Sequence, residues 1–468
     1  MTSSGPALLR QINLSGAIAL VISNTVGVGI LTASGYLARD LGDPALFLAI
    51  WLVGGVLAWI GALCYSELGM NFPASGGEYV YLTQAYGPVW GFMTGWTSFL
   101  AGFAAPVAAA SLAFSDYVGT FFPVFQQGNV YWEVGSGMFS LRLGGAQILA
   151  SAAIGVLTLA NLFGVQRAAN LQKLLTGLKL SVLGLFILLA FLMGSGNWAN
   201  FSMPSLREST TPIAAQFAIS FYFVYVSFSG WNAATYIAEE IRDPQRNLPR
   251  ALLIGTGIVT ALYVLLNVVF LYAAPLGVLK GVVAVGALAS SRLFGPQMAG
   301  FFSALMAMAL LATVNAMVTV GPRVAYAMAR NGAFFPAAAK VDPQWRTPVP
   351  AILMQASVSM LMTMTTLPGL FFFIGFTLNF FSLMSVAALF RFRRRPGWRR
   401  MNAVSAAWPL LPSIFLAIGA WMTLFGLTLE PMVSLAACVL IGASALYYHR
   451  RLKLRKGDTA WDASSTVN

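Results

Sequence analysis

Long apolar runs dominate the chain, and short polar or basic segments separate them. A helix that crosses a bilayer needs about 20 mostly apolar residues, because the hydrocarbon layer is about 30 Å thick. On this criterion the pattern predicts spans at 12–38, 43–69, 88–115, 142–163, 170–194, 212–238, 249–274, 298–328, 348–366, 368–390, 406–428 and 430–449. We therefore expect an all-α membrane protein of about twelve transmembrane helices, with both termini on one side.

Composition supports the membrane assignment. Hydrophobic residues make up 58% of the 468-residue chain, and charged residues make up only 9%. A soluble domain usually carries about 25% charged residues, which it needs to cover its surface in water. The main solvent of this protein is therefore expected to be the lipid bilayer.

The net charge of +13 is distributed unevenly between the loops. If the N-terminus is cytoplasmic, 21 of the 27 Lys and Arg residues lie on the cytoplasmic side, 5 lie outside and Lys179 lies within a span. This asymmetry follows the positive-inside rule and argues against a nucleic-acid partner. Residues 1–11 are predicted to be a cytoplasmic N-terminus without a cleavable signal peptide, and 450–468 a basic cytoplasmic tail.

The segments between the spans differ in character. Residues 70–82 contain Pro73, Gly76 and Gly77, which predict a cytoplasmic turn leading to a short helix. Residues 116–141 form a longer outer connection. Residues 275–297 are too polar to span, and we expect short helices there that fold over an outer vestibule.

Several chemistries are excluded by residue usage. Cys64 and Cys438 both lie in apolar runs and the outer loops contain no cysteine, which argues against a disulfide-linked partner subunit. The single histidine, His449, lies in the basic tail, so neither a histidine metal site nor a catalytic triad is expected. Without a nucleophile–base set, we predict no enzyme activity, no metal and no cofactor.

The first and sixth predicted spans each contain glycine and small polar residues at mid-depth. The first contains Ser23-Asn24-Thr25-Val26-Gly27-Val28-Gly29-Ile30, and the sixth contains Tyr225-Val226-Ser227-Phe228-Ser229-Gly230-Trp231-Asn232. A glycine weakens a helix by about 1 kcal/mol relative to alanine. The two spans lie five apart, so they occupy matching positions in two five-helix halves of opposite topology, which indicates a transporter site. The simpler alternative is that these glycines only allow close helix packing.

Breaks at these positions would expose complementary backbone charges. The restart of the first span offers N–H groups at Gly27, Val28, Gly29 and Ile30, which favour a carboxylate. The end of the first half of the sixth span offers carbonyls at Val226, Ser227 and Ser229, which favour an ammonium group. Together these groups describe a receptor for a zwitterion.

Two charged residues bear on coupling. Lys179 lies about nine residues, or roughly 13 Å, into the fifth span, where a charge costs at least about 2.5 kcal/mol. We expect it to bond to carbonyls freed at the first break, as a fixed cation in place of sodium; snorkelling to the membrane surface is the alternative. Glu67 ends the second span and is a candidate proton relay, the alternative being a structural ion pair. No acidic residue lies at the centre of a span, which favours a neutral substrate.

Three stretches resemble the amino acid–polyamine–organocation superfamily, and L-type amino acid transporters with their bacterial relatives most of all. These stretches are Asn24-Thr25-Val26-Gly27-Val28-Gly29-Ile30; Tyr65-Ser66-Glu67-Leu68-Gly69 with Pro73-Ala74-Ser75-Gly76-Gly77-Glu78-Tyr79; and Ser229-Gly230-Trp231-Asn232 with Glu239-Glu240, Asp243-Pro244 and Arg246-Asn247-Leu248-Pro249. The resemblance covers most of the chain. It implies two inverted five-helix repeats at 12–194 and 212–390, two further helices at 406–449, and a location in a bacterial plasma membrane.

The resemblance also implies a site. Substrate contacts fall on the stretches Thr25, Val26, Gly27, Val28, Gly29 and Ile30, and Val226, Ser227, Phe228, Ser229 and Gly230; the lysine of sodium-independent members falls on Lys179. Many relatives carry an aromatic gate where this chain has Val226, so Phe228 or Tyr225 would have to replace it, or the pocket is wider. The expected function is sodium-independent transport of neutral amino acids by alternating access, as an exchanger or a proton symporter. A polyamine carrier and an amino-acid-sensing receptor without flux are the alternatives.

Overall fold

The structure is a computed structural model that describes residues 10, 12–74, 76–137, 139–162, 165–330, 332–342, 344–345 and 347–452. Ser75 of the expected turn lies outside the described residues, and so do almost all of the expected N-terminus 1–11 and most of the basic tail 450–468.

Long apolar helices make up most of the described chain. Ten of them are long and apolar enough to cross a membrane, and the bent pair of α1 (Leu14–Thr25) and α2 (Val28–Leu41) is an eleventh candidate. The ten are α3 (Pro44–Asn71), the continuous run of α5 (Pro88–Thr97), η1 (Ser98–Ala104) and α6 (Ala105–Val118), α7 (Gly145–Leu162), α8 (Val165–Met193), α9 (Ile213–Phe228) with η4 (Ala233–Glu240), α10 (Pro244–Ala273), α13 (Pro296–Arg330), α15 (Leu367–Phe392), α17 (Leu410–Leu429) and α18 (Pro431–Tyr447) with η6 (Tyr448–Leu452). The prediction of a helical membrane protein is confirmed.

The predicted ninth span is the exception to the expected count. Residues 348–366 form α14 (Val349–Met362), which has only 14 residues and is shorter than a straight span requires. After Thr363 the α-helical pattern changes to tighter turns, with the N–H groups of Met364 and Thr365 donating to the Leu361 and Met362 carbonyls (3.1 Å each), and the next helix begins at Leu367. Length and composition therefore give ten or eleven spans in the described residues, rather than twelve.

Short elements connect the spans, largely as expected. The turn after α3 leads to α4 (Glu78–Tyr86), and the segment 275–297 contains the short helices α11 (Leu276–Leu279) and α12 (Val285–Phe294). The remaining short elements are η2 (Pro123–Phe125), η3 (Trp198–Ser202), η5 (Pro336–Ala339) and α16 (Asn402–Ala406).

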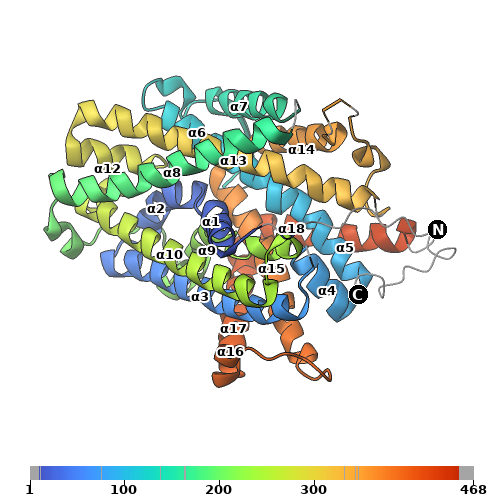
Figure 1. The fold of residues 1–468 in the computed structure, drawn as a ribbon. Coiled ribbons are helices and arrows are strands. Elements are labelled where there is room, and N and C mark those ends of the chain that lie inside the picture. The colour runs from blue at the N-terminus through green and yellow to red at the C-terminus, as the bar shows by residue number, and fades with distance from the viewer. Residues whose placement is uncertain are drawn as a thin grey trace.

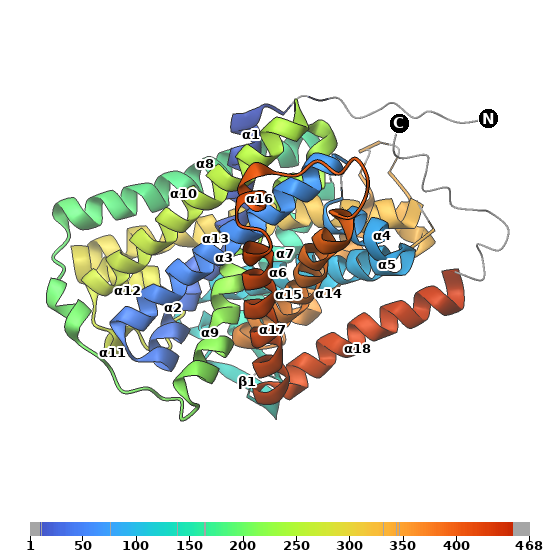
Figure 2. The same cartoon turned by 90° about the horizontal axis from the view of Figure 1, so that it is seen from below.

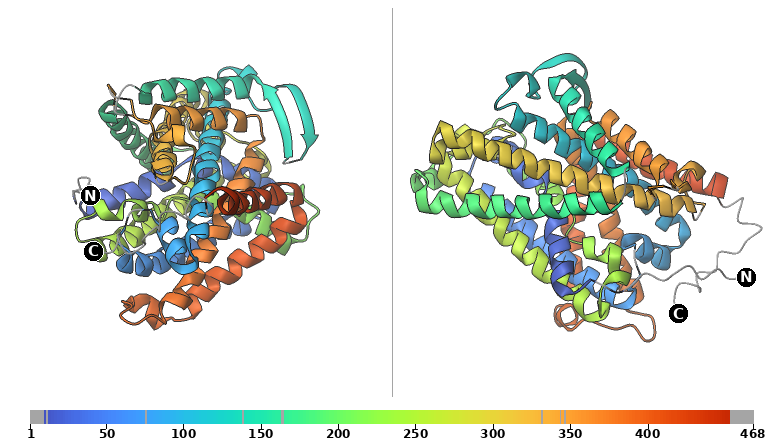
Figure 3. Two further views of the ribbon diagram at one scale, coloured as in Figure 1. Left: turned by 90° about the vertical axis from the view of Figure 1, so that its right-hand side faces the viewer. Right: turned by 45° about the horizontal axis from the view of Figure 1, so that its top comes forward.

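The all-α prediction was wrong in the connection between the third and fourth spans. Strands β1 (Val130–Ser136) and β2 (Phe139–Gly144) pair as an antiparallel hairpin, so α7 begins at Gly145 rather than at residue 142. β-branched and aromatic residues favour an extended chain, and Val130, Tyr131, Trp132 and Val134 supply them in β1. The hairpin extends from the edge of the helical bundle (Figure 3).

The helices form a bundle whose centre and edge differ in burial. Figures 1 and 2 show α9 inside the bundle, and 72% of the most apolar 18-residue stretch of Ile213–Glu240 is buried. By contrast, α17 and α18 lie at the edge, where only 28% and 33% of the corresponding stretches are buried. Around α9 pack α2, α3, α15 and α17, while α10 runs along α3 and α1. The halves α2 and α9 of the two irregular spans therefore lie in the interior, whereas α1 buries only Ala17, Val21 and Thr25.

The beginning of the first span lies beside the end of the sixth. Ile12 and Ile241 form an isolated parallel β-bridge. The Ile12 N–H donates to the Glu240 carbonyl (2.9 Å), and the Arg242 N–H donates to the Ile12 carbonyl (2.9 Å). These main-chain hydrogen bonds join the two irregular spans at one end of the bundle.

Candidate functional site

The first span is broken between Thr25 and Val28, as predicted. Val26 is extended, Gly27 has φ −144° and ψ −148°, and the helices on either side are bent by 41°. Side chains close the end of α1, where Thr25 Oγ1 donates to the Val21 carbonyl (2.7 Å) and Asn24 Nδ2 to the Leu20 carbonyl (2.9 Å). No side chain caps the start of α2. Its first N–H groups, which no carbonyl of the same helix can reach, therefore remain available to an anion.

The sixth span is irregular immediately after Phe228. Gly230 has φ +104°, a conformation that glycine adopts without strain, and the chain continues as the 3₁₀ segment η4 rather than as an α-helix. The prediction of fully open carbonyls was only partly correct. The Val226 carbonyl accepts hydrogen bonds from the N–H (3.0 Å) and Oγ (2.6 Å) of Ser229.

The two irregular segments contact each other through their glycines. A Cβ atom on Gly29 would lie 2.2 Å from Ser227 Oγ and 2.5 Å from Ser227 Cα. A Cβ atom on Gly230 would lie 2.7 Å from the Asn24 carbonyl oxygen. Each break therefore requires a glycine against the backbone of the other. The structure brings together the two stretches that the sequence singled out, 25–30 and 226–230.

Lys179 reaches the first break from α8. Its side chain is 2% exposed, and its Nζ donates to the carbonyls of Ser23 (3.1 Å) and Val26 (2.5 Å). These are carbonyls at the end of α1 and within the break, as the sequence predicted. The snorkelling alternative is wrong, because Nζ bonds inside the bundle and not at its surface.

Tyr263 of α10 reaches both breaks, and the sequence analysis missed it. Its hydroxyl lies 2.8 Å from the Thr25 carbonyl oxygen and 2.9 Å from the Ser227 carbonyl oxygen. Its ring packs between Trp51 of α3 (centroids 5.6 Å apart) and Phe228 (4.9 Å). A tyrosine within an apolar run looks like an ordinary core residue. Only the packing of α10 against α1 and α3 reveals its role.

The aromatic candidates for a gate lie on the α3 side of the sixth span. Phe228 packs on Trp51 and Tyr263, and Tyr225 lines a small apolar cavity together with Phe228, Trp231 and Phe415. Val226 lies against Gly375 of α15, where a Cβ atom would be 3.1 Å from Val226 Cγ2. Whether any of these positions gates the site remains a prediction.

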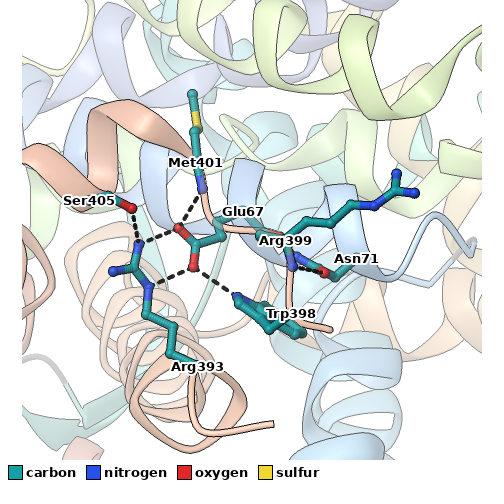
Figure 4. Close-up of polar contacts among 7 residues, drawn as sticks. All are labelled: Glu67, Asn71, Arg393, Trp398, Arg399, Met401 and Ser405. Carbon is teal, nitrogen blue, oxygen red and sulfur yellow. Dashed lines mark hydrogen bonds and ion pairs between the residues drawn. The ribbon is translucent and has the colours of Figure 1, made fainter. Parts of the chain in front are cut away.

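Glu67 lies away from both breaks, in a buried ion pair (Figure 4). Its carboxylate accepts from Arg393 Nε (2.7 Å) and Nη2 (2.5 Å), from Trp398 Nε1 (2.9 Å) and from the Met401 N–H (3.1 Å). Its side chain is fully buried and that of Arg393 is 7% exposed. This geometry agrees with the alternative role of Glu67 in a structural ion pair. The ion pair joins the connection after α15 to α3. The role of a proton relay remains a prediction.

A membrane bundle in which two irregular spans meet at mid-length, with charged and hydroxyl donors on their carbonyls, has the architecture of a carrier for a small polar molecule. Comparison with known proteins identifies the family of carriers to which the chain belongs. The sequence profile of the amino acid permease family matches residues 12–443. The chain belongs to this family, within the amino acid–polyamine–organocation superfamily. It is an integral membrane amino acid transporter and not an enzyme.

Individual relatives agree with the family assignment. Asc-type amino acid transporter 1 of Mus musculus is 30% identical over 451 residues, which cover 93% of this chain and 80% of the relative. Large neutral amino acids transporter small subunit 2 of Mus musculus is 30% identical over 434 residues, covering 92% and 78%. The b(0,+)-type amino acid transporter 1 of Mus musculus is 27% identical over 457 residues, covering 95% and 88%. The predicted resemblance to L-type transporters is thus confirmed.

Replacing Gly29 by alanine should abolish transport. The added methyl group would overlap Ser227, both at its side chain and at its backbone, so the two breaks could not keep their contact. Uptake of a labelled amino acid by cells, normalised to the amount of protein in the membrane, measures the effect. Gly184→Ala on α8 is the matched control and should retain uptake, because nothing lies within 4 Å of its new Cβ. Normal uptake by Gly29→Ala would contradict the proposed contact.

Removing Arg393 should destabilise the protein. Arg393→Leu leaves the Glu67 carboxylate buried and unpaired, which should lower the free energy of unfolding by about 3–5 kcal/mol. The double variant Glu67→Leu/Arg393→Leu should regain most of the loss. Thermal unfolding of the purified protein in detergent measures both, and the exposed neighbour Arg394→Leu serves as control. A melting temperature of Arg393→Leu equal to that of wild type would contradict this account.

Proposed function

We propose that this protein is a sodium-independent secondary transporter of neutral amino acids, which works by alternating access around the breaks of the first and sixth spans. The proposed architecture is two inverted five-helix repeats, 12–194 and 212–390, followed by two further helices, 406–449. In this arrangement α14 is a short ninth span, and both termini face the cytoplasm of a bacterial plasma membrane. The excess of basic residues at one end of the spans supports this orientation.

The position of the Lys179 amine carries the proposal. Nζ lies where two backbone carbonyls, of Ser23 and Val26, converge on one point inside the membrane bundle. Converging carbonyl oxygens within a broken helix are the groups that hold a coupling sodium ion in carriers of this kind. A lysine fixed at these carbonyls supplies the positive charge permanently. Transport then has no need of a sodium ion at this position.

The proposed substrate is bound through its two backbone charges. Its carboxylate would accept hydrogen bonds from the uncapped N–H groups at the start of α2, where the helix dipole also favours an anion. Its ammonium group would donate to the carbonyls of Thr25 and Ser227. Tyr263 has one hydroxyl proton for these two acceptors, so one carbonyl lacks a full partner at any moment. An ammonium group supplies the missing donor.

Neutral side chains suit this site better than cationic ones. In the part of the chain that the structure describes, the buried carboxylates are Asp40, Glu67, Glu78 and Asp116. Asp40, Glu67 and Asp116 bond to groups outside both breaks, and Glu78 reaches the sixth span only beyond Gly230, through Asn232 and Tyr236. A cationic side chain or a polyamine would enter this site without a counter-charge, at a considerable cost in desolvation. The name of one relative, large neutral amino acids transporter small subunit 2, agrees with this choice.

No disulfide-linked partner is part of the proposal. Cys64 is buried in α3, and Cys438 lies within α18, an apolar span at the edge of the bundle. Neither thiol is in a connection between spans, where a partner subunit in water could reach it.

Replacing Lys179 by alanine should abolish or uncouple transport and leave expression intact. The carbonyls of Ser23 and Val26 would lose their donor, so the first break would no longer be held in place. Uptake at matched protein levels measures the loss, and a supplement of sodium tests whether the ion replaces the amine. Lys340→Ala, at an exposed position, is the control. Full activity of Lys179→Ala in sodium-free buffer would remove the proposed role.

Purified protein in liposomes tests the whole proposal. We expect saturable uptake of labelled neutral amino acids in sodium-free buffer, at a rate that sodium does not increase, with little competition from polyamines or cationic amino acids. Comparing preloaded with empty liposomes, with and without a pH gradient, separates exchange from proton symport. Saturable binding without flux under any gradient would identify a receptor instead. A requirement for sodium would refute the role given to Lys179.

A further inference from the structure

Glu78 is a buried acid whose hydrogen-bond partners are all neutral. It is the first residue of α4 and is only 6% exposed. Oε1 accepts from the Tyr65 hydroxyl (2.9 Å) and from Asn232 Nδ2 (2.8 Å), and Oε2 accepts from the Tyr236 hydroxyl (2.5 Å). A carboxylate can be buried with neutral donors alone, but its charge remains uncompensated.

Glu67, on the same side of the molecule, shows the contrast. Its carboxylate is also buried, but it receives a bidentate ion pair from Arg393. Among the described residues, the ion pairs join Arg393 to Glu67, Arg39 to Asp40 and Arg142 to Glu133. Glu78 therefore lacks the charge compensation that stabilises Glu67. A proton is the simplest cation that can supply it.

The carboxyl group lies at the junction between α4 and the sixth span. Asn232 and Tyr236 belong to the segment that follows the Gly230 break, and Tyr65 belongs to α3. The contact is tight, since a Cβ atom on the neighbouring Gly77 would lie 2.7 Å from Thr235 Oγ1. On its other side α4 packs against α5 and α15. Any movement of the second half of the sixth span away from α4 must therefore break the hydrogen bonds that Glu78 accepts from Asn232 and Tyr236.

Glu78 is the one carboxyl group among the ionisable side chains that meet at this junction in the described part of the chain. The ionisable side chains that face it are the phenols of Tyr65, Tyr81, Tyr225 and Tyr236, and phenols are uncharged at neutral pH. Of the arginines that follow α15, Arg393 bonds to Glu67, Arg395 to the Gln84 carbonyl and Arg399 to Gln245, while Arg394 and Arg400 are exposed. Burial raises the pKa of Glu78 above its ordinary value, although the hydrogen bonds from Tyr236, Tyr65 and Asn232 lower it. Tyr236, which bonds directly to the carboxyl group, is 36% exposed, so the site lies close to the surface.

We propose that Glu78 is a proton-binding site that controls the opening of the transporter at the end where α4 meets the sixth span. When this end is closed, as in the structure, the carboxyl group is buried and binds a proton from the adjacent water. When it opens, the carboxyl group becomes hydrated and returns the proton to the same water. Low pH therefore stabilises the closed arrangement, and a transporter that must open to complete its cycle slows down. This inference rests on the alternating access proposed above.

Exchange of amino acid in liposomes, with equal pH inside and outside, tests the inference without a proton driving force. Wild type should slow by about fivefold or more between about pH 8 and about pH 5, the lower end of the usual range for coupled sites. Glu78→Gln, which is always neutral, should be slow and independent of pH. Tyr236→Phe removes one donor to the ionised carboxylate, so its pH response should shift to higher pH. Glu239→Gln, at an exposed carboxylate of the same η4, should keep the wild-type response.

Infrared spectroscopy of the purified protein supplies a readout that does not require transport. The difference between the spectra of wild type and Glu78→Gln should contain the carbonyl stretching band of a protonated carboxyl group, and this band should titrate in this pH range. Taking the difference removes any band from another buried acid with neutral donors, such as Asp116. Transport with wild-type pH response in Glu78→Gln, or absence of such a band, overturns the inference and leaves the transport function intact. A titrating band in a protein that carries no amino acid supports the proton site and overturns the proposed function instead.

Discussion

The need to pair backbone polar groups inside a membrane governs this structure. Lipid offers no hydrogen bonds, so a helix that breaks within the bilayer must find donors and acceptors in the protein or in a bound molecule. The first break meets this need from two sides, through Lys179 on α8 and Tyr263 on α10. The sixth break shares Tyr263 and adds the side chain of Ser229. The part left incomplete, at the start of α2 and around the Thr25 and Ser227 carbonyls, has the polarity of an amino acid backbone.

Close contact between the breaks makes this arrangement specific. Gly29 and Gly230 each lie against the backbone of the opposite segment, where a larger residue would not fit. Such glycines weaken a helix by themselves. In this protein the loss of helix stability is offset because the two spans come close enough for the Tyr263 hydroxyl to bond to carbonyls of both. Each break is therefore stabilised by its contact with the other break.

Sequence alone predicted the features that depend on neighbouring residues or on large energies. The long apolar runs identified most of the spans, and the glycines at 27, 29 and 230 located both irregular segments. The cost of burying a charge led to the carbonyl partners of Lys179. What it missed depends on packing between distant segments. Tyr263 looks like any core tyrosine, Glu78 looks like a loop residue, and the hairpin 130–144 lies in a connection that a search for helices passes over. The short α14 was hidden because an apolar run does not show where its helix ends.

The β-bridge between Ile12 and Ile241 has a mechanical consequence. It fastens the chain just before α1 to the chain just after η4 by two main-chain hydrogen bonds. Neither bond depends on a side chain, so any residue except proline, which lacks the N–H group, can maintain the coupling. At this end of the bundle the two interrupted spans are joined, so a rotation of one must move the other. A single hinge movement can thereby expose the breaks of both spans at once.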